Sequence, residues 1–269
     1  MTVGFNLGVI MKNLILGICL LAVTSCGHMG ETKKAEYTEG ATLWVQNAAE
    51  FRALSYQAFN SARLYLDRAL LTKKNRKKPA VVVDIDETVL DNSPYQAVNI
   101  LKNRSFDRKY WDEWIQLAQA KAIPGAIDFL NYSHKKGVEV IYISNRKIKG
   151  LDATYKNLLN LGFPVKRQNI FLRTTTSNKE ERRQNVLKKY DIVLLAGDTL
   201  ADFSEVFNEK GTNDRNILVD KMRDDFGKKF IMLPNPMYGD WEGAMYNYEF
   251  STSTEKKKKL RKGHLYPHN

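Results

Sequence analysis

The chain has 269 residues, of which 43% are hydrophobic and 27% are charged, an ordinary balance for a soluble globular protein. The chain is therefore long enough and apolar enough to bury a hydrophobic core. Its length fits one sizeable domain, with or without a smaller appendage. The formal net charge of +12 favours anionic partners such as phosphorylated substrates, anionic lipid or nucleic acid. Charge alone does not choose among these partners, and a solvated basic surface is the alternative.

The N-terminal segment is typical of a secretory signal. From Met11 the chain reads MKNLILGICLLAVTSC, in which the basic Lys12 precedes about ten apolar residues and a few small residues precede Cys26. The apolar stretch is too short to span a bilayer, which needs about 20 apolar residues. Residues 1–10 lack a basic start, so Met11 is a better candidate than Met1 for the first residue of the protein.

The end of this signal, Val23-Thr24-Ser25-Cys26, resembles the lipobox of bacterial lipoproteins. The resemblance implies that residues 1–25 are removed and that Cys26 is acylated and holds the protein on a membrane. An ordinary signal peptide with an incidental cysteine is the alternative. The other cysteine, Cys19, lies inside the signal, so the mature chain is expected to have neither a disulfide nor a cysteine-based zinc site.

The ends of the mature chain are predicted to lie outside the main domain at residues 41–250. Residues 26–40 are polar and predict a tether, after which helical periodicity from residue 41 to about residue 71 predicts one helix or two. Residues 251–269 contain the run KKKKLRK and predict a flexible, solvated basic tail. Contact of this tail with nucleic acid or lipid is the alternative.

Within the main domain, short apolar runs alternate with helical stretches. Strands are predicted at residues 80–83, 138–143, 169–172, 192–196 and 230–233. Helices are predicted at residues 126–135, 151–161, 179–189 and 202–210. This alternation predicts an α/β fold, namely a Rossmann-like parallel sheet with helices on both faces.

The segment 93–122 interrupts the alternation and predicts a small, mainly helical insertion. It is rich in aromatic residues, namely Tyr95, Phe106, Tyr110, Trp111 and Trp114. Because ligands of open α/β sheets bind at the carboxyl ends of the strands, an insertion just beyond the first strand is expected to cover the binding site.

Polar side chains follow the predicted strands at their carboxyl ends. The residues are Asp84 and Asp86 after the first strand, Ser144, Asn145 and Arg146 after the second, Lys179 near the third, and Asp198 and Asp202 after the fourth. Asp84 and Asp86 are expected to point the same way, because strand side chains alternate with a period of two. Two close carboxylates repel each other unless a cation or a proton relieves the repulsion, so this edge predicts a metal ion and nucleophilic chemistry.

Taken together, these residues resemble the four-motif pattern of the haloacid dehalogenase superfamily: Asp-x-Asp-x-Thr, then Ser, then Lys, then Gly-Asp-x₃-Asp. More narrowly, the chain resembles the class C acid phosphatases, bacterial outer-membrane lipoproteins also called DDDD phosphohydrolases. The stretches that carry the resemblance are DIDETVLDN (84–92), IYISNR (141–146), GDTLADF (197–203) and FIMLPNPMYGDWE (230–242). Each motif is weak alone, and the set is specific.

The resemblance implies a role for each motif. Asp84 would be the nucleophile that forms an aspartyl-phosphate, and Asp86 would donate a proton to the leaving alcohol and then take one from water. One Mg²⁺ ion would be held by Asp84, Asp198 and the backbone carbonyl of Asp86. Ser144 would bind a phosphoryl oxygen, and Lys179 would offset the charge of the transition state. The supporting residues would be Thr88, Asn145, Arg146 and Asp202, the last of which would orient Lys179 or a metal-bound water, or ligate the metal.

Each assignment has a simpler structural alternative. Asp86 and Asp202 could be helix caps, and Ser144 could be a turn residue. The phosphate-binding cation could be Arg146, Arg182 or Arg183 in place of Lys179.

Substrate and location follow from the same resemblance. Trp111 and Tyr238 would stack on a nucleobase and Asp112 would reach the sugar, although these rings could instead be core residues. The expected protein is a magnesium-dependent acid phosphatase of 5′-nucleotides and other small phosphomonoesters, without nucleic acid as a partner and with a homodimer allowed. It would be lipid-anchored at the bacterial outer membrane and would face the periplasm or the cell surface. The alternatives are a phosphotransferase of the same superfamily and a non-catalytic surface binding lipoprotein.

Overall fold

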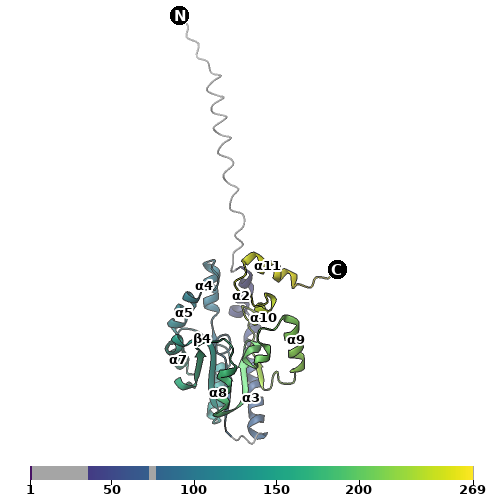
Figure 1. Ribbon diagram of the computed structural model, residues 1–269. Helices are drawn as coiled ribbons and strands as arrows, with labels where there is room; N and C mark the ends of the chain where they lie inside the picture. The colour runs from purple at the N-terminus through teal and green to yellow at the C-terminus, as the bar shows by residue number, and fades with distance from the viewer. Residues whose placement is uncertain (2–35, 73–76, 269) are drawn as a thin grey trace. The chain divides into compact units, whose positions relative to one another are not determined.

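The computed structural model describes Met1, residues 36–72 and residues 77–268 (Figure 1). The predicted signal, Cys26 and most of the predicted tether lie outside the described residues. The first described elements after Met1 are a 3₁₀ turn, η1 (Glu36–Thr38), and α2 (Glu39–Asn47), so the tether prediction is wrong for residues 36–40. Among the described helices, none combines the length and the apolar character needed to cross a bilayer.

A parallel sheet of five strands forms the centre of the domain. Its strands are β1 (Lys78–Val83), β4 (Glu139–Lys147), β5 (Ile170–Arg173), β6 (Tyr190–Gly197) and β7 (Phe230–Met232), in the order β5-β4-β1-β6-β7. All five predicted strands are confirmed, and so is the predicted fold class. Because β1 lies between β4 and β6, the polar residues at the carboxyl ends of these three strands meet at one edge of the sheet, and Ser144, Asn145 and Arg146 belong to the last part of β4 itself.

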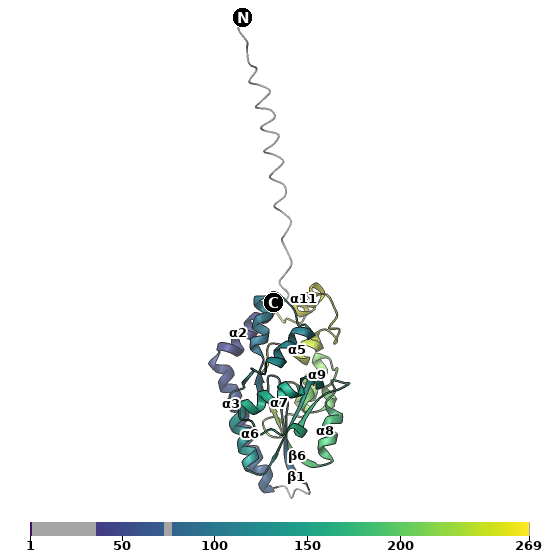
Figure 2. The same ribbon diagram turned by 90° about the vertical axis from the view of Figure 1, so that its left-hand side faces the viewer.

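Helices cover both faces of the sheet (Figure 2). On one face, α3 (Ala49–Thr72), α6 (Ala126–Lys135) and α7 (Leu151–Asn160) pack on a core that includes Val81 and Val83. On the other face, α8 (Glu180–Leu187) packs through Val186 on the core that includes Ala80 and Val82. The alternation of these four strand residues between two cores explains why the β1 run is apolar throughout.

Two predicted helical stretches differ in detail from the structure. The stretch from 41 to 71 is two helices, α2 and α3, because the backbone at Ala48 is extended, with ψ of 128°. The helix predicted at 202–210 is wrong. In its place are two 3₁₀ turns, η4 (Leu200–Asp202) and η5 (Glu205–Phe207), and the next α-helix is α9 (Thr212–Lys221). The hydroxyl of Ser204 accepts a hydrogen bond from the backbone N–H of Val206, which starts the second turn separately from the first.

The aromatic insertion is a closed substructure of two helices, α4 (Ser93–Leu101) and α5 (Arg108–Leu117). A short antiparallel pair, β2 (Leu90–Asp91) and β3 (Lys121–Ala122), joins its two ends. The insertion therefore begins and ends at one place, directly after the aspartate-containing loop that follows β1.

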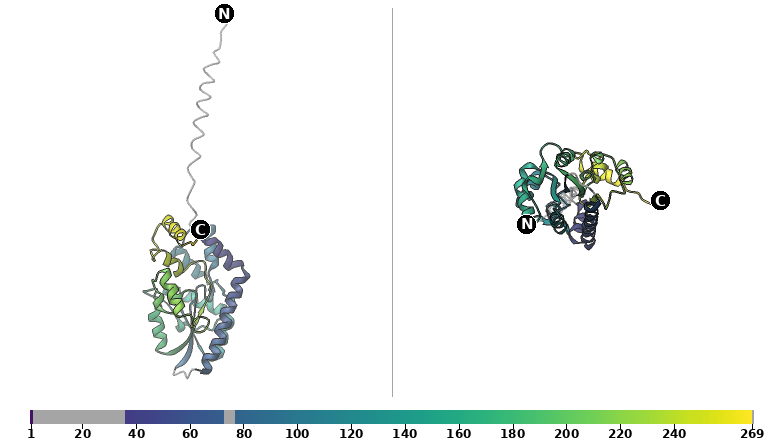
Figure 3. Two further views of the ribbon diagram at one scale, coloured as in Figure 1. Left: turned by 90° about the vertical axis from the view of Figure 1, so that its right-hand side faces the viewer. Right: turned by 90° about the horizontal axis from the view of Figure 1, so that it is seen from below.

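The C-terminal basic segment contains an ordered helix, so the prediction of a flexible tail is wrong for residues 254–263. Helix α11 (Thr254–Gly263) follows α10 (Asp240–Met245) and lies at one end of the domain (Figure 3). Arg261 donates a hydrogen bond of 2.7 Å to the hydroxyl of Tyr246, and its guanidinium lies 3.9 Å from the ring centroid of Tyr37. These contacts fix a helix that has no buried residue of its own.

At the amino end of the sheet, the buried carboxylate of Glu139 joins three segments. It pairs with Lys78 and Lys166 at 2.6 Å each, and it accepts a hydrogen bond of 2.6 Å from the side chain of Asn169. Burial alone would raise the pKa of Glu139, but these donors together lower it from 4.5 to about 2. Because the folded pKa is depressed, the carboxylate stabilises the fold above pH 4.5, and this contribution is lost as the pH falls from 4.5 to about 2.

Glu139→Gln is therefore expected to lower the free energy of unfolding at pH 7 by roughly 2–3 kcal/mol. The difference from the unsubstituted protein should shrink steadily below pH 4.5. Urea unfolding at several pH values measures both effects. Glu249→Gln is the matched control, because Glu249 pairs with Lys256 on the exposed surface. A deficit for Glu139→Gln that does not change between pH 7 and pH 3 would contradict this account.

Candidate active site

Asp84 lies at the carboxyl end of β1, next to β6. Its backbone N–H donates a hydrogen bond of 2.9 Å to the carbonyl of Ala196, so the sheet ladder fixes its position. The carboxylate is buried and forms an ion pair with Lys179. Burial raises the pKa of Asp84 to about 7, the Lys179 ammonium opposes this shift, and the carboxylates of Asp202 and Asp86 add to it. The predicted repulsion between carboxylates at this edge is therefore present.

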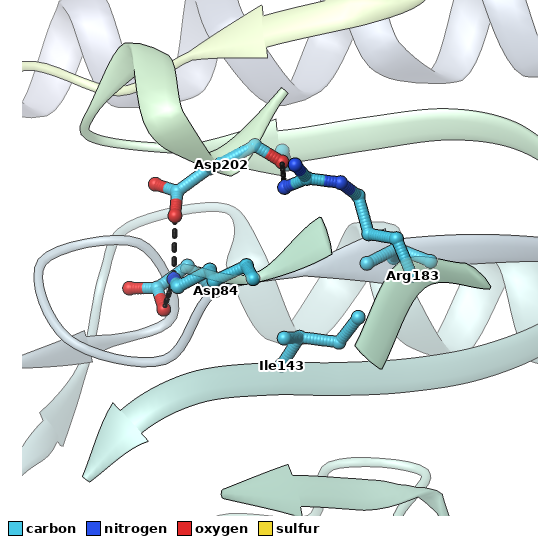
Figure 4. A pocket seen from close by; sticks show the side chains of 7 residues that line it. Asp84, Ile143, Arg183 and Asp202 are labelled. Carbon is cyan, nitrogen blue, oxygen red and sulfur yellow. Dashed lines mark hydrogen bonds and ion pairs between the residues drawn. The ribbon is translucent and has the colours of Figure 1, made fainter. Parts of the chain in front are cut away.

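Lys179 is the buried cation of the site. It immediately precedes α8, and its Nζ contacts Asp84 and lies 2.5 Å from Asp202 Oδ1. Figure 4 labels these two aspartates. Burial would lower the pKa of Lys179, but the two carboxylates raise it, so the ammonium stays charged. The other oxygen of Asp202 accepts a hydrogen bond of 3.1 Å from the backbone N–H of Thr199. Asp202 is therefore the third residue of a reciprocal cap that begins at Thr199, and the alternative that it is a helix N-cap is wrong.

The three arginines considered as alternatives to Lys179 have other partners. Arg183 donates to the backbone carbonyl of Asp202 (Figure 4) and to that of Ala201. Arg182 donates to the carbonyl of Ser144 and the side chain of Asn145. Arg146 binds Asp86. Among these four cations, Lys179 is the one that contacts Asp84.

Asp198 follows β6 and completes a carboxylate cluster. Oxygens of Asp84, Asp198 and Asp202 lie within 4.8 Å of one another, close enough to share a cation. Asp198 accepts hydrogen bonds from the Thr88 hydroxyl at 3.4 Å and from the Asn235 side chain at 2.7 Å. Burial raises the pKa of Asp198 well above its usual value, and the charges of Asp202 and Asp84 raise it further.

This donor set fits a hard divalent cation. The cluster offers carboxylate oxygens, which are the preferred ligands of magnesium, and a bound cation would relieve the repulsion that raises two of the pKa values. Both oxygens of Asp202 already have partners, Lys179 and the backbone of Thr199. Asp84 and Asp198 are therefore the better side-chain ligands, and Asp202 is better suited to orient Lys179.

The carboxylate of Asp86 points to a different set of partners. Its Oδ1 receives hydrogen bonds from Arg146 Nε and Asn92 Nδ2, both at 2.9 Å, and its Oδ2 lies 3.3 Å from the hydroxyl of Ser144. Ser144 is fully buried and also accepts from the backbone N–H of Arg146 at 3.1 Å. In this structure Ser144 therefore contacts the predicted acid–base residue, and its contact with phosphate stays a prediction.

Gly197, the last residue of β6, allows the backbone and Asp202 to approach closely. A Cβ at this position would lie 2.3 Å from the Cβ and from Oδ2 of Asp202. Any side chain here would displace the carboxylate that holds Lys179, which explains the glycine of the fourth motif.

Three polar residues that contact the site were not among the predicted site residues. Asn92 binds Asp86, and Asn235 binds Asp198. Glu87 is buried, has the left-handed φ of 57°, and accepts hydrogen bonds from the backbone and side chain of Asn92. Asn235 could have been predicted from the sequence, since it follows the fifth strand at the same sheet edge. Glu87 and Asn92 lie in the first motif, but the sequence does not indicate that the loop folds back on itself.

The predicted substrate-binding aromatics have different environments. Trp111 is 8% exposed and packs edge-to-face on Tyr95 with ring centroids 5.1 Å apart, so the core alternative fits it better than nucleobase stacking. Asp112 pairs at 2.5 Å with Lys149 and lines a surface hollow on α5. Tyr238 is half-buried and donates a hydrogen bond to Glu87, which places it beside the loop that carries Asp86. Neither Trp111 nor Asp112 has a contact with the carboxylate cluster in the described structure.

Comparison with known proteins identifies the family. The model of the acid phosphatases of the HAD superfamily, subfamily IIIB, matches residues 22–241. A class C acid phosphatase from Bacillus anthracis has a similar structure, with a TM-score of 0.85 and 47% identity over 88% of this chain and 100% of that chain. A second structure of the Bacillus anthracis enzyme, with tungstate bound, matches equally well.

Plant proteins show a more distant similarity. A stem 31 kDa glycoprotein of Glycine max is 25% identical over 199 residues, covering 71% of this chain and 70% of its own. Acid phosphatase 1 of Solanum lycopersicum is 26% identical over 164 residues, covering 58% and 57% of the two chains. The resemblance to class C acid phosphatases is thereby confirmed: the chain belongs to subfamily IIIB of the haloacid dehalogenase superfamily and is a phosphomonoester hydrolase.

Proposed function

We propose that this acid phosphatase is magnesium-dependent and hydrolyses 5′-nucleotides and other small phosphomonoesters through an aspartyl-phosphate on Asp84. The observation that carries the proposal is that Asp84 pairs with the Lys179 ammonium and also lies within 4.8 Å of the Asp198 carboxylate. A nucleophilic carboxylate needs positive charge on the side of the incoming phosphate, and this arrangement supplies one cation and a place for another.

The side chains divide the reaction between them. A carboxylate oxygen of Asp84 attacks phosphorus, and the bond from phosphorus to the leaving oxygen breaks while that oxygen takes a proton from Asp86. Water then attacks phosphorus, gives its proton to Asp86, and releases phosphate from Asp84. Lys179 offsets the negative charge that builds up on the phosphoryl oxygens, and Asp202 keeps Lys179 in place.

Asp84, Asp198 and the backbone carbonyl of Asp86 would hold the metal. Bound there, Mg²⁺ would neutralise phosphate charge and orient the phosphoryl group for attack. The tungstate-bound Bacillus anthracis relative supports an oxyanion site in this family, because tungstate is a tetrahedral oxyanion like phosphate.

Nucleotide preference and location rest on the sequence. Tyr238 is half-buried beside the first-motif loop and is the better candidate for a base-stacking ring, with Trp111 and Asp112 less favoured by their contacts. The signal segment and Cys26 favour a lipid anchor at the bacterial outer membrane.

Hydrolysis of adenosine 5′-phosphate, compared with glycerol phosphate and p-nitrophenyl phosphate with and without a chelator, tests the substrate range and the metal requirement together.

Metal binding is expected to depend on pH in a specific direction. The folded pKa of Asp84 is raised from 3.8 to about 7, so the metal-free protein loses stability as the pH rises through this window. Mg²⁺ binds the deprotonated carboxylates, so the increase in melting temperature on adding Mg²⁺ should be largest above pH 7 and should shrink towards pH 4.

Asp198→Asn is the informative variant for this prediction, because it removes a ligand charge and keeps the side-chain shape. Its melting temperature is expected to respond little to Mg²⁺ at any pH. Asp191→Asn, at the amino end of β6, should respond as the unsubstituted protein does. A Mg²⁺ response that is equal at pH 5 and pH 8, or that survives in Asp198→Asn, would contradict the proposed metal site.

A further inference from the structure

Asp86 is held by a buried polar network in which its two carboxylate oxygens have different hydrogen-bonding partners. Arg146 Nε and Nη2 lie 2.9 and 2.8 Å from Oδ1, and Asn92 Nδ2 lies 2.9 Å from the same oxygen. The other oxygen, Oδ2, has one hydrogen-bonding partner among the described side chains, the Ser144 hydroxyl at 3.3 Å. A hydroxyl can accept a hydrogen bond as well as donate one, whereas the guanidinium and amide nitrogens only donate.

The donors of this network are themselves fixed. The Arg146 side chain is 1% exposed, and its Nη1 donates a hydrogen bond of 3.1 Å to the hydroxyl of Thr154 on α7. Asn92 Oδ1 receives a hydrogen bond of 2.8 Å from Trp114 Nε1 on α5. A buried guanidinium with several partners has little freedom to move, so Oδ1 of Asp86 is clamped from two directions.

We propose that Arg146 and Asn92 are positioning residues that assign the proton-transfer role to Oδ2 of Asp86. Two hydrogen bonds and the ion pair with Arg146 occupy Oδ1, so Oδ2 is the oxygen left to exchange a proton with the reacting groups. The Asp86 side chain is 17% exposed, compared with 1% for Arg146, so the carboxyl group remains reachable from solvent. In the first step the Oδ2 proton passes to the leaving oxygen, and in the second Oδ2 takes a proton from the attacking water.

The network also links the acid–base residue to the aromatic insertion. Trp114 lies on α5 within the insertion, and its indole N–H orients the amide of Asn92 so that Nδ2 faces Asp86. The inference rests on the proposed function, because it requires Asp86 to be the proton donor. It adds the residues that hold this carboxyl group in place, and it gives a role to a buried arginine that contacts neither Asp84 nor Asp198.

The readout is the dependence of kcat/KM on the leaving group. For an enzyme with a covalent intermediate, kcat/KM reports the steps up to the first phosphoryl transfer, in which Asp86 donates its proton. An alkoxide leaving group needs that proton, whereas p-nitrophenolate leaves readily without it. A misplaced proton donor therefore lowers kcat/KM selectively for alkyl phosphates, which a general loss of folded protein cannot do.

Arg146→Met and Asn92→Ala are expected to lower kcat/KM for glycerol phosphate by about 10²-fold and for p-nitrophenyl phosphate by less than about tenfold. Trp114→Phe, which keeps an aromatic ring and removes the indole N–H together with part of the ring volume, should show a smaller effect of the same selectivity and keeps the test available if the other two variants fold poorly. Asn157→Ala is the matched control, because this buried amide binds the backbone of Ala120 away from the network. It should lower the melting temperature without changing the ratio between the two substrates.

Asp86→Asn distinguishes failure of the positioning role of Arg146 and Asn92 from failure of the proton-donor role of Asp86. If it shows the selective loss while Arg146→Met and Asn92→Ala lower both substrates equally, the positioning role is overturned and the proposed function stands. If Asp86→Asn itself shows no selectivity between the two substrates, the proton-donor role in the proposed function fails.

Discussion

Replacing Asp84 by asparagine is expected to lower kcat for p-nitrophenyl phosphate by at least about 10⁴-fold, while the protein remains folded. The amide keeps the shape of the carboxylate but cannot attack phosphorus. It also removes one of the charges that repel Asp202 and Asp86, which offsets part of the lost ion pair with Lys179. A steady-state assay with Mg²⁺, together with a thermal melt, separates lost chemistry from lost structure.

The matched control for this change is Asp191→Asn. Asp191 lies at the amino end of β6 and accepts a hydrogen bond from the backbone of Lys77, at the opposite edge of the sheet. It should keep normal turnover. Turnover by Asp84→Asn within about tenfold of the unsubstituted protein would show that another group attacks phosphorus. Absence of turnover in the unsubstituted protein with Mg²⁺ would instead favour a lipoprotein that binds ligands without catalysis.

Lys179→Met is expected to produce the second large effect, on stability and on turnover. The change leaves the buried carboxylates of Asp84 and Asp202 without their shared cation, and removal of one member of a buried ion pair costs about 3–5 kcal/mol. Loss of the charge that stabilises the transition state should lower kcat by about 10²–10³-fold. Urea unfolding at pH 8 in the presence of a chelator measures the first effect, because a bound metal would compensate for the missing ammonium.

A double substitution shows which part of the loss comes from repulsion. Lys179→Met combined with Asp202→Asn removes one positive and one negative charge, so it should recover a substantial part of the stability and none of the activity. Lowering the pH towards 5 should also shrink the deficit of the single variant, because Asp84 then takes up a proton. A Lys179→Met protein as stable as the unsubstituted protein at pH 8 without metal would contradict the buried ion-pair network.

The sequence supports the prediction of the sheet and of the carboxylate cluster for one physical reason. Buried parallel strands leave short apolar runs, and polar residues just past such runs meet at one edge. This places Asp84, Lys179 and Asp198 together before any coordinates are known. The same reasoning extends to Asn235 after β7, whose amide binds Asp198.

Other features depend on contacts that the sequence does not display. An aromatic residue in a helix is equally compatible with a core ring and with a ligand platform, so the burial of Trp111 against Tyr95 could not be predicted. Helix α11 has no apolar face to mark it, and it is fixed by contacts of Arg261 with Tyr246 and Tyr37 from distant parts of the chain. The partners of Asp86 likewise come from two separate segments, β4 and the residue before α4, so Arg146 could be assigned only a general supporting role.

The central claim is that Asp84 carries the phosphoryl group during turnover. Acid quenching of the enzyme during steady-state hydrolysis, followed by reduction with borohydride, converts an aspartyl-phosphate to homoserine, which peptide mass spectrometry can locate. We expect homoserine at position 84. Its amount should fall when substrate is omitted, and it should be missing in Asp84→Asn. Recovery of unmodified Asp84 from an enzyme quenched at saturating substrate, with the phosphoryl group found on a different residue, would contradict it.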